Sequence, residues 1–228
     1  SENPKDKRLR TSILIEDKGK VIVIDTGPDF RQQMLRANVQ QLDAVVFTHE
    51  HKDHVAGLDD VRAFNFKQQK DMEIYATEQV QAALKREFYY AFETKKYPGV
   101  PHINLNTITN KKFNIGEVEL TPIDVWHYKM PVKAFRVGNF TYITDAKTIP
   151  EASFDKIKGT KILVINALQK EPHISHFTLD EAVTFAEKVG AETTYLTHIS
   201  HNLGLHDVVE NDLPSNILLA YDGLKIEL

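Results

Sequence analysis

The chain has 228 residues and a mass of 26.0 kDa, with 42% hydrophobic and 26% charged residues. These ordinary globular values exclude a fibrous or disordered protein and predict a single domain over residues 1–228. The formal net charge of -4 argues against an extended nucleic-acid-binding surface, and the absence of cysteine excludes disulfides, Cys-ligated zinc and thiol catalysis.

The longest apolar runs, VIVI and ILVI, are far too short to cross a bilayer. We therefore expect a cytoplasmic protein with no membrane partner. Because the sequence begins at Ser1 rather than at a methionine, a trimmed leader that carries a targeting signal is left open.

Five short apolar runs predict buried strands, and each run ends in a polar residue. The runs are Val21–Ile24, Ala44–Phe47, Phe140–Thr144, Ile162–Ile165 and Thr194–Thr197, followed by Asp25, Thr48-His49, Asp145, Asn166 and His198. Polar groups collected at the carboxyl ends of strands are typical of a site in an α/β protein. The runs fall into two halves, one through about Thr121 and one after it, which predicts two β-sheets facing each other with helices outside.

Two segments between these strands have helical patterns. Ala76–Phe92 carries apolar residues at helical spacing with Thr77 as a possible N-cap, and we expect a helix there. The segment Thr178–Val189 has stronger end signals, because Thr178 and Glu181 form a capping box and Gly190 stands just beyond its last residue. Both segments are expected to cover a sheet.

The stretch FTHEHKDHV, residues 47–55, concentrates histidines and carboxylates directly after an apolar strand. His49 and His51 alternate by two, so an extended backbone directs both side chains to one side. Asp53 and His54 follow, where a loop is expected to turn into a helix beginning near Gly57. Since histidine is the commonest protein ligand for transition metals and carboxylates accompany it in mixed sites, the stretch predicts a metal centre rather than a solvated loop.

The segment THEHKDH resembles the H-x-H-x-D-H signature of the metallo-β-lactamase superfamily, and IDTG, TD and LTHIS stand at matching places along the chain. The resemblance covers nearly the whole sequence. It implies an α/β fold of four layers, the αββα sandwich. No strand and Gly-rich turn precede RTSILIE, so the first strand of the family is expected to be missing.

The resemblance also implies a site with two divalent metal ions, zinc or manganese, and no other cofactor. It assigns three histidines to the first metal, two histidines and an aspartate to the second, and one bridging aspartate: His49, His51 and His127; Asp53, His54 and His198; and Asp145. Asp25 matches an aspartate that orients the site without binding metal.

Within the superfamily, IDTGPDFRQQ, HKDHVAGLDDVRAFN and HISHFTLDEA resemble the branch that contains the phosphoribosyl cyclic phosphate phosphodiesterase, called PhnP-like. This resemblance implies hydrolysis of a cyclic or small phosphodiester by a hydroxide held between the two ions. Two dications carry four positive charges, from which Asp53, Asp145 and a hydroxide subtract three. The remaining positive charge favours a small anionic phosphodiester as the partner.

Phosphodiester cleavage also needs a proton donor for the leaving oxygen. The resemblance assigns this role to His176, with the neighbouring His173 left open, and Asp53 is counted among the catalytic residues. Weaker expectations concern side chains that contact substrate: Arg31, Arg62, Tyr89, Tyr90 and Tyr97.

Three other classes of function are kept as alternatives. The first is a lactonase or thioesterase on the same fold, and the second is a nuclease that resembles the tRNA 3′-processing enzymes. The third is a redox or non-enzymatic metal protein, which is disfavoured because His51 stands where a redox di-iron site usually has Glu. A homodimer is left open.

Overall fold

The computed structural model describes residues 1–95 and 97–228. These residues form two compact units: the first unit is Arg10–Glu119, and the second unit combines Ser1–Leu9 with Leu120–Leu228. The boundary near residue 120 lies close to the division at Thr121 that the sequence predicts. Each unit has its own cluster of buried apolar side chains. The assignment of the whole chain to one domain stays a prediction.

The first unit is built on a sheet of the order β1-β2-β3-β4-β5. β1 and β2 pair antiparallel, and β2, β3, β4 and β5 are parallel to one another. Its elements are β1 Ile13–Asp17, β2 Lys20–Ile24, α1 Phe30–Arg36, β3 Ala44–Val46, α2 Lys52–Val55, the 3-10 helix η2 Leu58–Val61, α3 Arg62–Gln68, β4 Met72–Ala76, α4 Glu78–Glu87, α5 Tyr89–Phe92, β5 Ile103–Thr107 and β6 Phe113–Ile115.

The predicted strands at residues 21–24 and 44–47 are confirmed as β2 and β3. Every residue of β3 is buried, as is expected of a parallel strand covered on both faces. Because β2 and β3 are parallel, their carboxyl ends meet at one edge of the sheet, where Asp25 and Thr48 follow them. The order of the strands therefore brings two distant polar segments of the sequence together.

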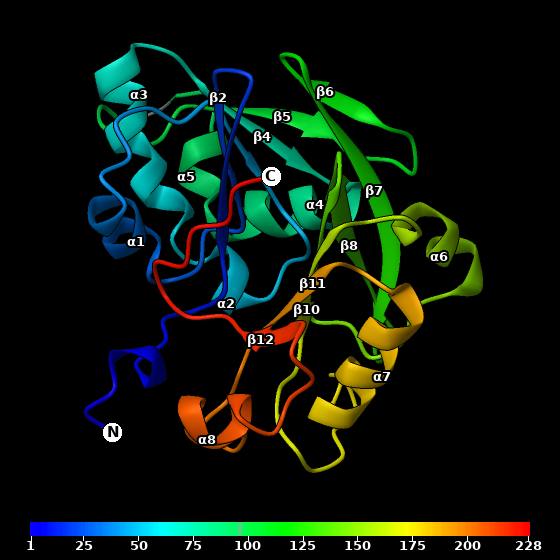
Figure 1. The fold of residues 1–228 in the computed structure, drawn as a ribbon. Coiled ribbons are helices and arrows are strands. Elements are labelled where there is room, and N and C mark those ends of the chain that lie inside the picture. The colour runs from blue at the N-terminus through cyan, green and yellow to red at the C-terminus, as the bar shows by residue number, and fades with distance from the viewer. Residues whose placement is uncertain (96) are drawn as a thin grey trace. The chain divides into compact units, whose positions relative to one another are not determined.

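The helices of the first unit differ in detail from the prediction. The expected N-cap Thr77 is confirmed, since its side chain accepts a hydrogen bond from the amide of Val80 (3.4 Å) at the start of α4. The rest of the segment differs, because Ala76 ends β4 and Phe88 separates α4 from α5. α4 packs along β4 and β5 (Figure 1). The next difference concerns the histidine stretch, because a short helix begins at Lys52 rather than near Gly57.

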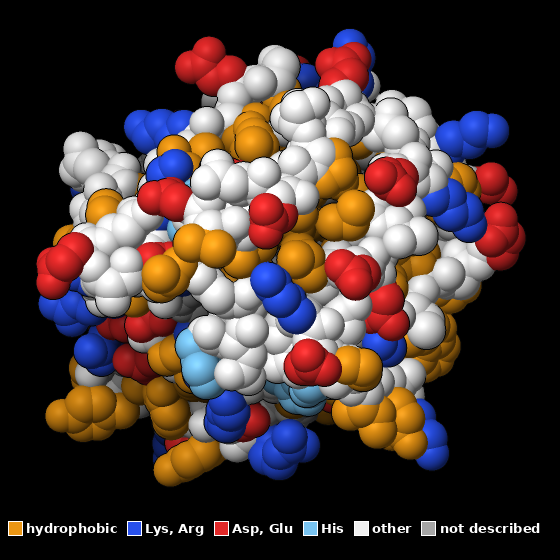
Figure 2. All heavy atoms as spheres, turned by 60° about the horizontal axis from the view of Figure 1, so that its bottom comes forward, with side chains coloured by type: hydrophobic (Ala, Val, Ile, Leu, Met, Phe, Trp, Pro, Cys, Tyr) orange, Lys and Arg blue, Asp and Glu red, His pale blue; other side chains and the backbone are white. Residues whose placement is uncertain are grey.

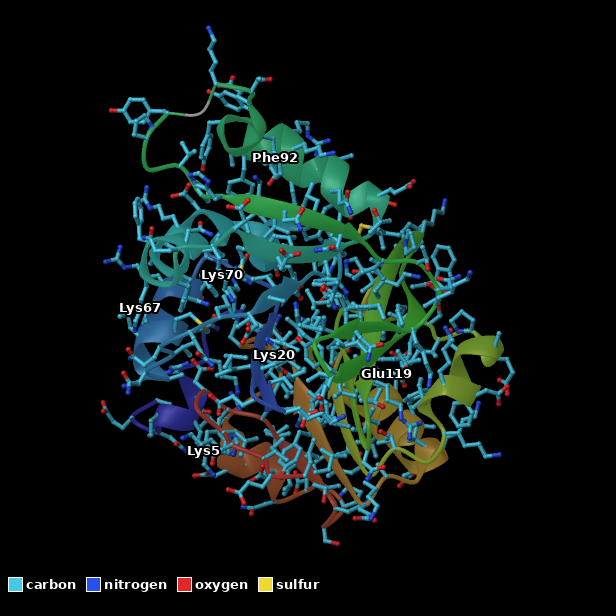
Figure 3. The ribbon with its side chains drawn as sticks, turned by 90° about the horizontal axis from the view of Figure 1, so that it is seen from above. Lys5, Lys20, Lys67, Lys70, Phe92 and Glu119 are labelled. Atoms are coloured by element: carbon cyan, nitrogen blue, oxygen red, sulfur yellow. The ribbon has the colours of Figure 1, made fainter. Side chains whose placement is uncertain are left out.

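Two lysines form ion pairs with Asp43, just before the amino end of β3. The Nζ atom of Lys20 lies 3.0 Å from Oδ1 of Asp43 and that of Lys70 lies 3.5 Å from the same atom, and Asp43 also accepts a hydrogen bond from the amide of Val21. Lys20 and Lys70 are labelled in Figure 3. These bonds fix the register of β3 beside β2 at the end opposite to His49.

The second sheet has the strand order β12-β11-β10-β9-β8-β7-β6, and its edge strand β6 lies just before the boundary of the units. β9, β10, β11 and β12 are parallel, whereas β7, β8 and β9 form an antiparallel meander. The elements of the second unit are the 3-10 helix η1 Pro4–Asp6, β7 Val118–His127, which begins at the boundary of the units, β8 Met130–Val137, β9 Phe140–Ile143, α6 Glu151–Ile157, β10 Ile162–Asn166, α7 Leu179–Val189, β11 Thr193–Thr197, α8 His206–Glu210 and β12 Ile217–Leu219.

The predicted strands at residues 140–144, 162–165 and 194–197 are confirmed as β9, β10 and β11. Their parallel pairing aligns the carboxyl ends, where Asp145, Asn166 and His198 stand. α7 lies against β10 and has the predicted capping box, with Gly190 left-handed (φ 67°) at its end.

The surface carries charges of both signs. On the face in Figure 2, Lys and Arg side chains are interspersed with Asp and Glu. Among the described residues, we find no helix that has the length and apolar character needed to cross a membrane.

Candidate metal centre

Seven of the described non-glycine residues have a left-handed backbone, and Asp25, Asp145 and His198 are three of them. The φ angles of Asp25, Asp145 and His198 are 67°, 54° and 52°. Non-glycine residues adopt such angles uncommonly, at a cost of about 1–3 kcal/mol each, and such residues concentrate at functional sites. Asp25 and His198 directly follow β2 and β11, and one residue separates Asp145 from β9. The strained backbone of these three residues, which the sequence already singles out, agrees with a functional role for the carboxyl ends of these strands.

In the first unit, Asp25 organises two of the predicted ligands. Its Oδ2 atom lies 2.7 Å from Nδ1 of His54 and accepts a hydrogen bond of 2.7 Å from the hydroxyl of Thr48. Because the Thr48 hydroxyl donates its hydrogen to Asp25, its oxygen accepts a hydrogen bond from Nδ1 of His49, 2.9 Å away. Both imidazoles then carry their proton on Nδ1 and their lone pair on Nε2. A carboxylate that fixes the tautomer in this way is the usual partner of a metal-binding histidine.

His51 and Asp53 complete the first-unit cluster. The rings of His49 and His51 are 4.8 Å apart between centroids, which agrees with two side chains directed to one side of an extended segment. Oδ2 of Asp53 lies 3.7 Å from Nε2 of His54. Asp53 and His54 sit on α2, so the first turn of this helix positions them. The first unit thus gathers all four residues of the H-x-H-x-D-H motif.

Two glycines allow the segments around this cluster to approach each other. A Cβ atom on Gly27 would lie 2.4 Å from the carbonyl oxygen of Asp53, and one on Gly57 would lie 2.2 Å from that of Gly27. Backbone hydrogen bonds lock the same contact, since the amide of Thr26 donates to His54 O and that of Gly57 donates to Thr26 O, both at 2.8 Å. The IDTG segment therefore packs directly against α2.

In the second unit, His127, Asp145 and His176 form a group that can hold a metal ion. One ligand atom from each of these side chains lies within 4.8 Å of the other two, and all three residues are largely withdrawn from solvent. His127 directs Nδ1 to the carbonyl oxygen of Ser175 at 2.8 Å, which leaves its lone pair on Nε2. Asp145 accepts a hydrogen bond of 2.6 Å on Oδ2 from the hydroxyl of Thr144. The sequence predicts two of the three as ligands.

His176 lies among the predicted ligands. Its ring stacks on that of His198, with centroids 4.9 Å apart, and meets that of His127 edge-on at 4.5 Å. Its Nδ1 lies 3.8 Å from Oδ1 of Asp145, and Nε2 of His198 lies 3.3 Å from the same oxygen. Burial lowers the pKa of His176 to about 3; the Asp145 carboxylate opposes this shift and the neighbouring histidines add to it. A neutral imidazole has the lone pair that a metal needs.

Asn166 is a site residue to which the sequence assigns no role. Its side chain is fully buried at the end of β10, accepts from the amide of Ala146 at 2.8 Å and donates to the carbonyl of Ala146 at 2.9 Å. Both bonds hold Ala146, the residue after Asp145, and so they stabilise the left-handed backbone conformation of Asp145. The only signal for Asn166 in the sequence is its place as a polar residue after an apolar run.

Asn166→Ala tests this clamp. The amide of Ala146 would lose its partner in a buried place, whereas its carbonyl would still accept from the amide of Phe177 at 2.9 Å. We expect the free energy of unfolding to fall by about 1–3 kcal/mol. Denaturant titration measures this fall. The matched control is Asn202→Ala at an exposed position, which should lower the free energy of unfolding by less than about 0.5 kcal/mol. Equal small losses in both variants would refute the clamp.

Other histidines lie outside these contacts. The ring of His173 is 5.1 Å from that of His176 between centroids, and Nδ1 of His173 accepts from the amide of Ser175 at 3.3 Å. His206 is buried beside Arg8, whose Nη2 lies 2.7 Å from its Nδ1. His201 and His102 are exposed. The assignment of His173, His176 and Asp53 to catalysis stays a prediction.

The donor set in each unit fits divalent metal ions. Nitrogen lone pairs on Nε2 together with carboxylate oxygens suit zinc, manganese, iron or nickel. The hydrogen bonds of Asp25, Thr48 and the Ser175 carbonyl supply the outer contacts that such ligands need. The identity and number of the ions stay predictions.

Comparison with known proteins identifies the family. The family model described as a beta-lactamase superfamily domain matches residues 20–199. The chain therefore belongs to the metallo-β-lactamase superfamily, whose fold is that of metal-binding hydrolases. A solved structure described as a new diphosphatase from the PhnP family is 38% identical, has a TM-score of 0.93 and covers 99% of this chain and 86% of its own. Within the superfamily, the chain belongs to the PhnP-like branch, and the predicted fold class is confirmed.

Two further proteins are similar to this chain, but each similarity is restricted in what it shows. A protein of Porphyromonas gingivalis named octanoyltransferase is 36% identical over 228 residues, which is 99% of this chain but only 46% of that protein. The chain thus spans about half the length of that curated relative. The short form of human tRNase Z has a TM-score of 0.72 at 16% identity, covering 96% of this chain and 92% of its own. At that identity the similarity shows the fold alone.

Proposed function

We propose that this protein is a metal-dependent hydrolase of phosphoric esters, with a cyclic or small phosphodiester as its substrate. The observation that carries the proposal is the set of histidines whose Nδ1 atoms are held by Asp25, Thr48 and the Ser175 carbonyl. Three imidazoles of fixed tautomer beside carboxylates form a donor set for divalent metals. The PhnP-family relative, described as a diphosphatase, supports a phosphoryl substrate.

We further propose a dinuclear metal site. The ligand assignment is that of the family motif: His49, His51, His127, Asp53, His54, His198 and Asp145. Bound divalent ions would supply polarisation of a phosphoryl oxygen and activation of a water molecule. Asp25 and Thr48 orient the imidazoles, and Asn166 holds the backbone beside Asp145.

The charge of this site favours an anionic substrate. Two dications bring four positive charges, and Asp53 and Asp145 are the only charged side chains in the proposed ligand set. The site therefore keeps a net positive charge, which attracts a phosphodiester more strongly than a neutral ester or amide. His176 is the proposed proton donor to the leaving oxygen, and His173 is its neighbour in the same loop.

We expect the metal-loaded protein to hydrolyse bis(p-nitrophenyl) phosphate and to contain about two metal ions per chain. Zinc and manganese are loaded separately, the ions are counted by elemental analysis, and p-nitrophenolate is followed by absorbance. Treatment with a chelator should abolish turnover and lower the melting temperature, because the ions bind the folded chain alone.

A second candidate function is hydrolysis of acyl substrates. It is favoured by the name of the Porphyromonas gingivalis relative, although the chain spans only 46% of that protein. A lactone and an octanoyl thioester therefore serve as the matched substrates. Faster turnover of either one than of the phosphodiester would reject the phosphoryl proposal, and one ion or fewer per chain would reject the dinuclear site.

A further inference from the structure

The turn between β7 and β8 carries a tyrosine in an unfavourable backbone conformation. His127 pairs with Met130, so Tyr128 and Lys129 form a two-residue turn. The φ angle of Tyr128 is 57°, in the left-handed region. Two-residue hairpin turns of the favoured types need a positive φ at their first position, and Gly, Asn or Asp usually provides it. A bulky side chain at a positive φ is an outlier, so the backbone of Tyr128 is strained.

Packing within the chain does little to offset this strain. Tyr128 is 53% exposed, and Nζ of Lys129 lies 5.3 Å from the centroid of its ring. A cation over an exposed ring adds little stability. Strained residues that a fold retains are concentrated at active sites and at places that hold a ligand. The ring is therefore expected to make its main contact with a ligand.

Tyr128 stands beside the candidate metal ligands of the second unit. It directly follows His127, whose Nδ1 lies 2.8 Å from the carbonyl oxygen of Ser175 and whose ring lies 4.5 Å from that of His176 between centroids. Ile174, the residue before Ser175, is 66% exposed. Because the contacts of His127 join the turn to this loop, an exposed aromatic ring and an exposed aliphatic side chain flank the same group of histidines.

These side chains have the chemistry to bind a planar ring next to a phosphate. Aromatic side chains stack on any nucleobase, because every base has a π face. Lys129 lies over one face of the Tyr128 ring, so a base can stack on the opposite face. The ammonium group of Lys129 also carries a charge of the sign that attracts a phosphate. A nucleotide combines the two groups that this edge of the site can bind.

We propose that Tyr128 stacks on the base of a nucleotide whose phosphate binds at the metal centre, and that it thereby determines specificity for nucleotides. This inference rests on the proposed function and narrows its substrate class from small phosphodiesters to those that carry a nucleobase. The competing explanation is that Tyr128 is an ordinary turn residue that no ligand contacts.

A matched pair of ligands separates the two explanations. Adenosine 5′-monophosphate (AMP) and ribose 5-phosphate share the sugar phosphate and differ by the base, and calorimetry on the metal-loaded protein measures their dissociation constants. We expect the wild type to bind AMP roughly tenfold to a hundredfold more tightly, the usual contribution of a stacked base. Tyr128→Gly should abolish this preference and leave the affinity for ribose 5-phosphate and the metal content unchanged.

The melting temperature supplies an independent readout. Glycine adopts a positive φ without steric cost, so metal-free Tyr128→Gly should melt about 2–4 °C above the metal-free wild type although it binds AMP less tightly. Tyr128→Phe keeps the ring and should keep the wild-type preference for AMP. Lys18→Gly is the matched control, since Lys18 also has a positive φ (47°) in a two-residue turn, between β1 and β2. It should leave the preference for AMP unchanged.

The proposal is overturned if Tyr128→Gly keeps the preference for AMP, or if the wild type binds both ligands equally. A lowered melting temperature with equal losses of affinity for both ligands would also overturn it, because Tyr128 would then serve packing alone. If bis(p-nitrophenyl) phosphate is not hydrolysed but the preference and its loss in Tyr128→Gly are both observed, the proposed hydrolysis fails and the nucleotide site stands.

Discussion

Asp145→Ala should abolish turnover and release metal, with a larger effect than His127→Ala. Asp145 is the proposed bridge between two ions, whereas His127 serves one. We expect kcat to fall by roughly a thousandfold or more, because metal polarisation of the reacting bond is worth several kcal/mol. The measurement pairs kcat with elemental analysis of the same samples.

Two variants serve as controls for Asp145→Ala. Asp145→Asn keeps the shape of the side chain and an oxygen that can accept from the Thr144 hydroxyl, so it separates lost charge from lost packing. Asp180→Ala removes an exposed carboxylate from α7 of the same unit and should keep both metals. Equal, small losses in Asp145→Ala and His127→Ala would show that Asp145 is not the bridge.

The sequence predicts much of this site because its chemistry is local. The stretch from His49 to His54 holds three histidines and an aspartate within six residues, so a metal centre can be predicted there without knowing the fold. The strands are equally direct, since apolar runs such as ILVI have few alternatives to burial. All five runs are confirmed as strands, each followed by its polar residues.

The supporting contacts could not be predicted because they depend on which strands are neighbours. Asn166 reads as an ordinary polar strand end until β10 pairs with β9 and brings its amide to Ala146. Thr48 likewise gains its role only where β3 lies parallel to β2, beside Asp25. Hydrogen bonds across a sheet are set by register, which a single sequence leaves open.

The predicted helix boundaries were wrong for a related reason. The apolar pattern of residues 76–92 continues through Phe88, but the backbone there leaves the helical region (φ -112°, ψ 38°) and divides α4 from α5. Lys52–Val55 likewise forms a helix of its own, which backbone hydrogen bonds tie to Thr26. Tertiary contacts, rather than local propensity, decided both boundaries.

Replacement of His176 distinguishes catalysis from metal binding. If His176 protonates the leaving oxygen, His176→Ala should keep both metals and lose roughly 10²–10⁴-fold in kcat, the usual worth of a positioned general acid. Burial lowers the pKa of His176 to about 3, so the side chain is neutral near pH 7. A bound phosphate group would have to raise this pKa before His176 could donate a proton, because an adjacent anion favours the charged imidazole.

The leaving group supplies the decisive comparison. The loss in His176→Ala should be small for p-nitrophenolate, which needs little protonation, and large for an alkyl or ribosyl leaving group. His173→Ala is the matched control from the same loop and should cost less on both substrates. Loss of a metal in His176→Ala would instead make His176 a ligand with His127 and Asp145, the group in which their ligand atoms lie within 4.8 Å. An exchange of behaviour between the two variants would assign the proton donor to His173.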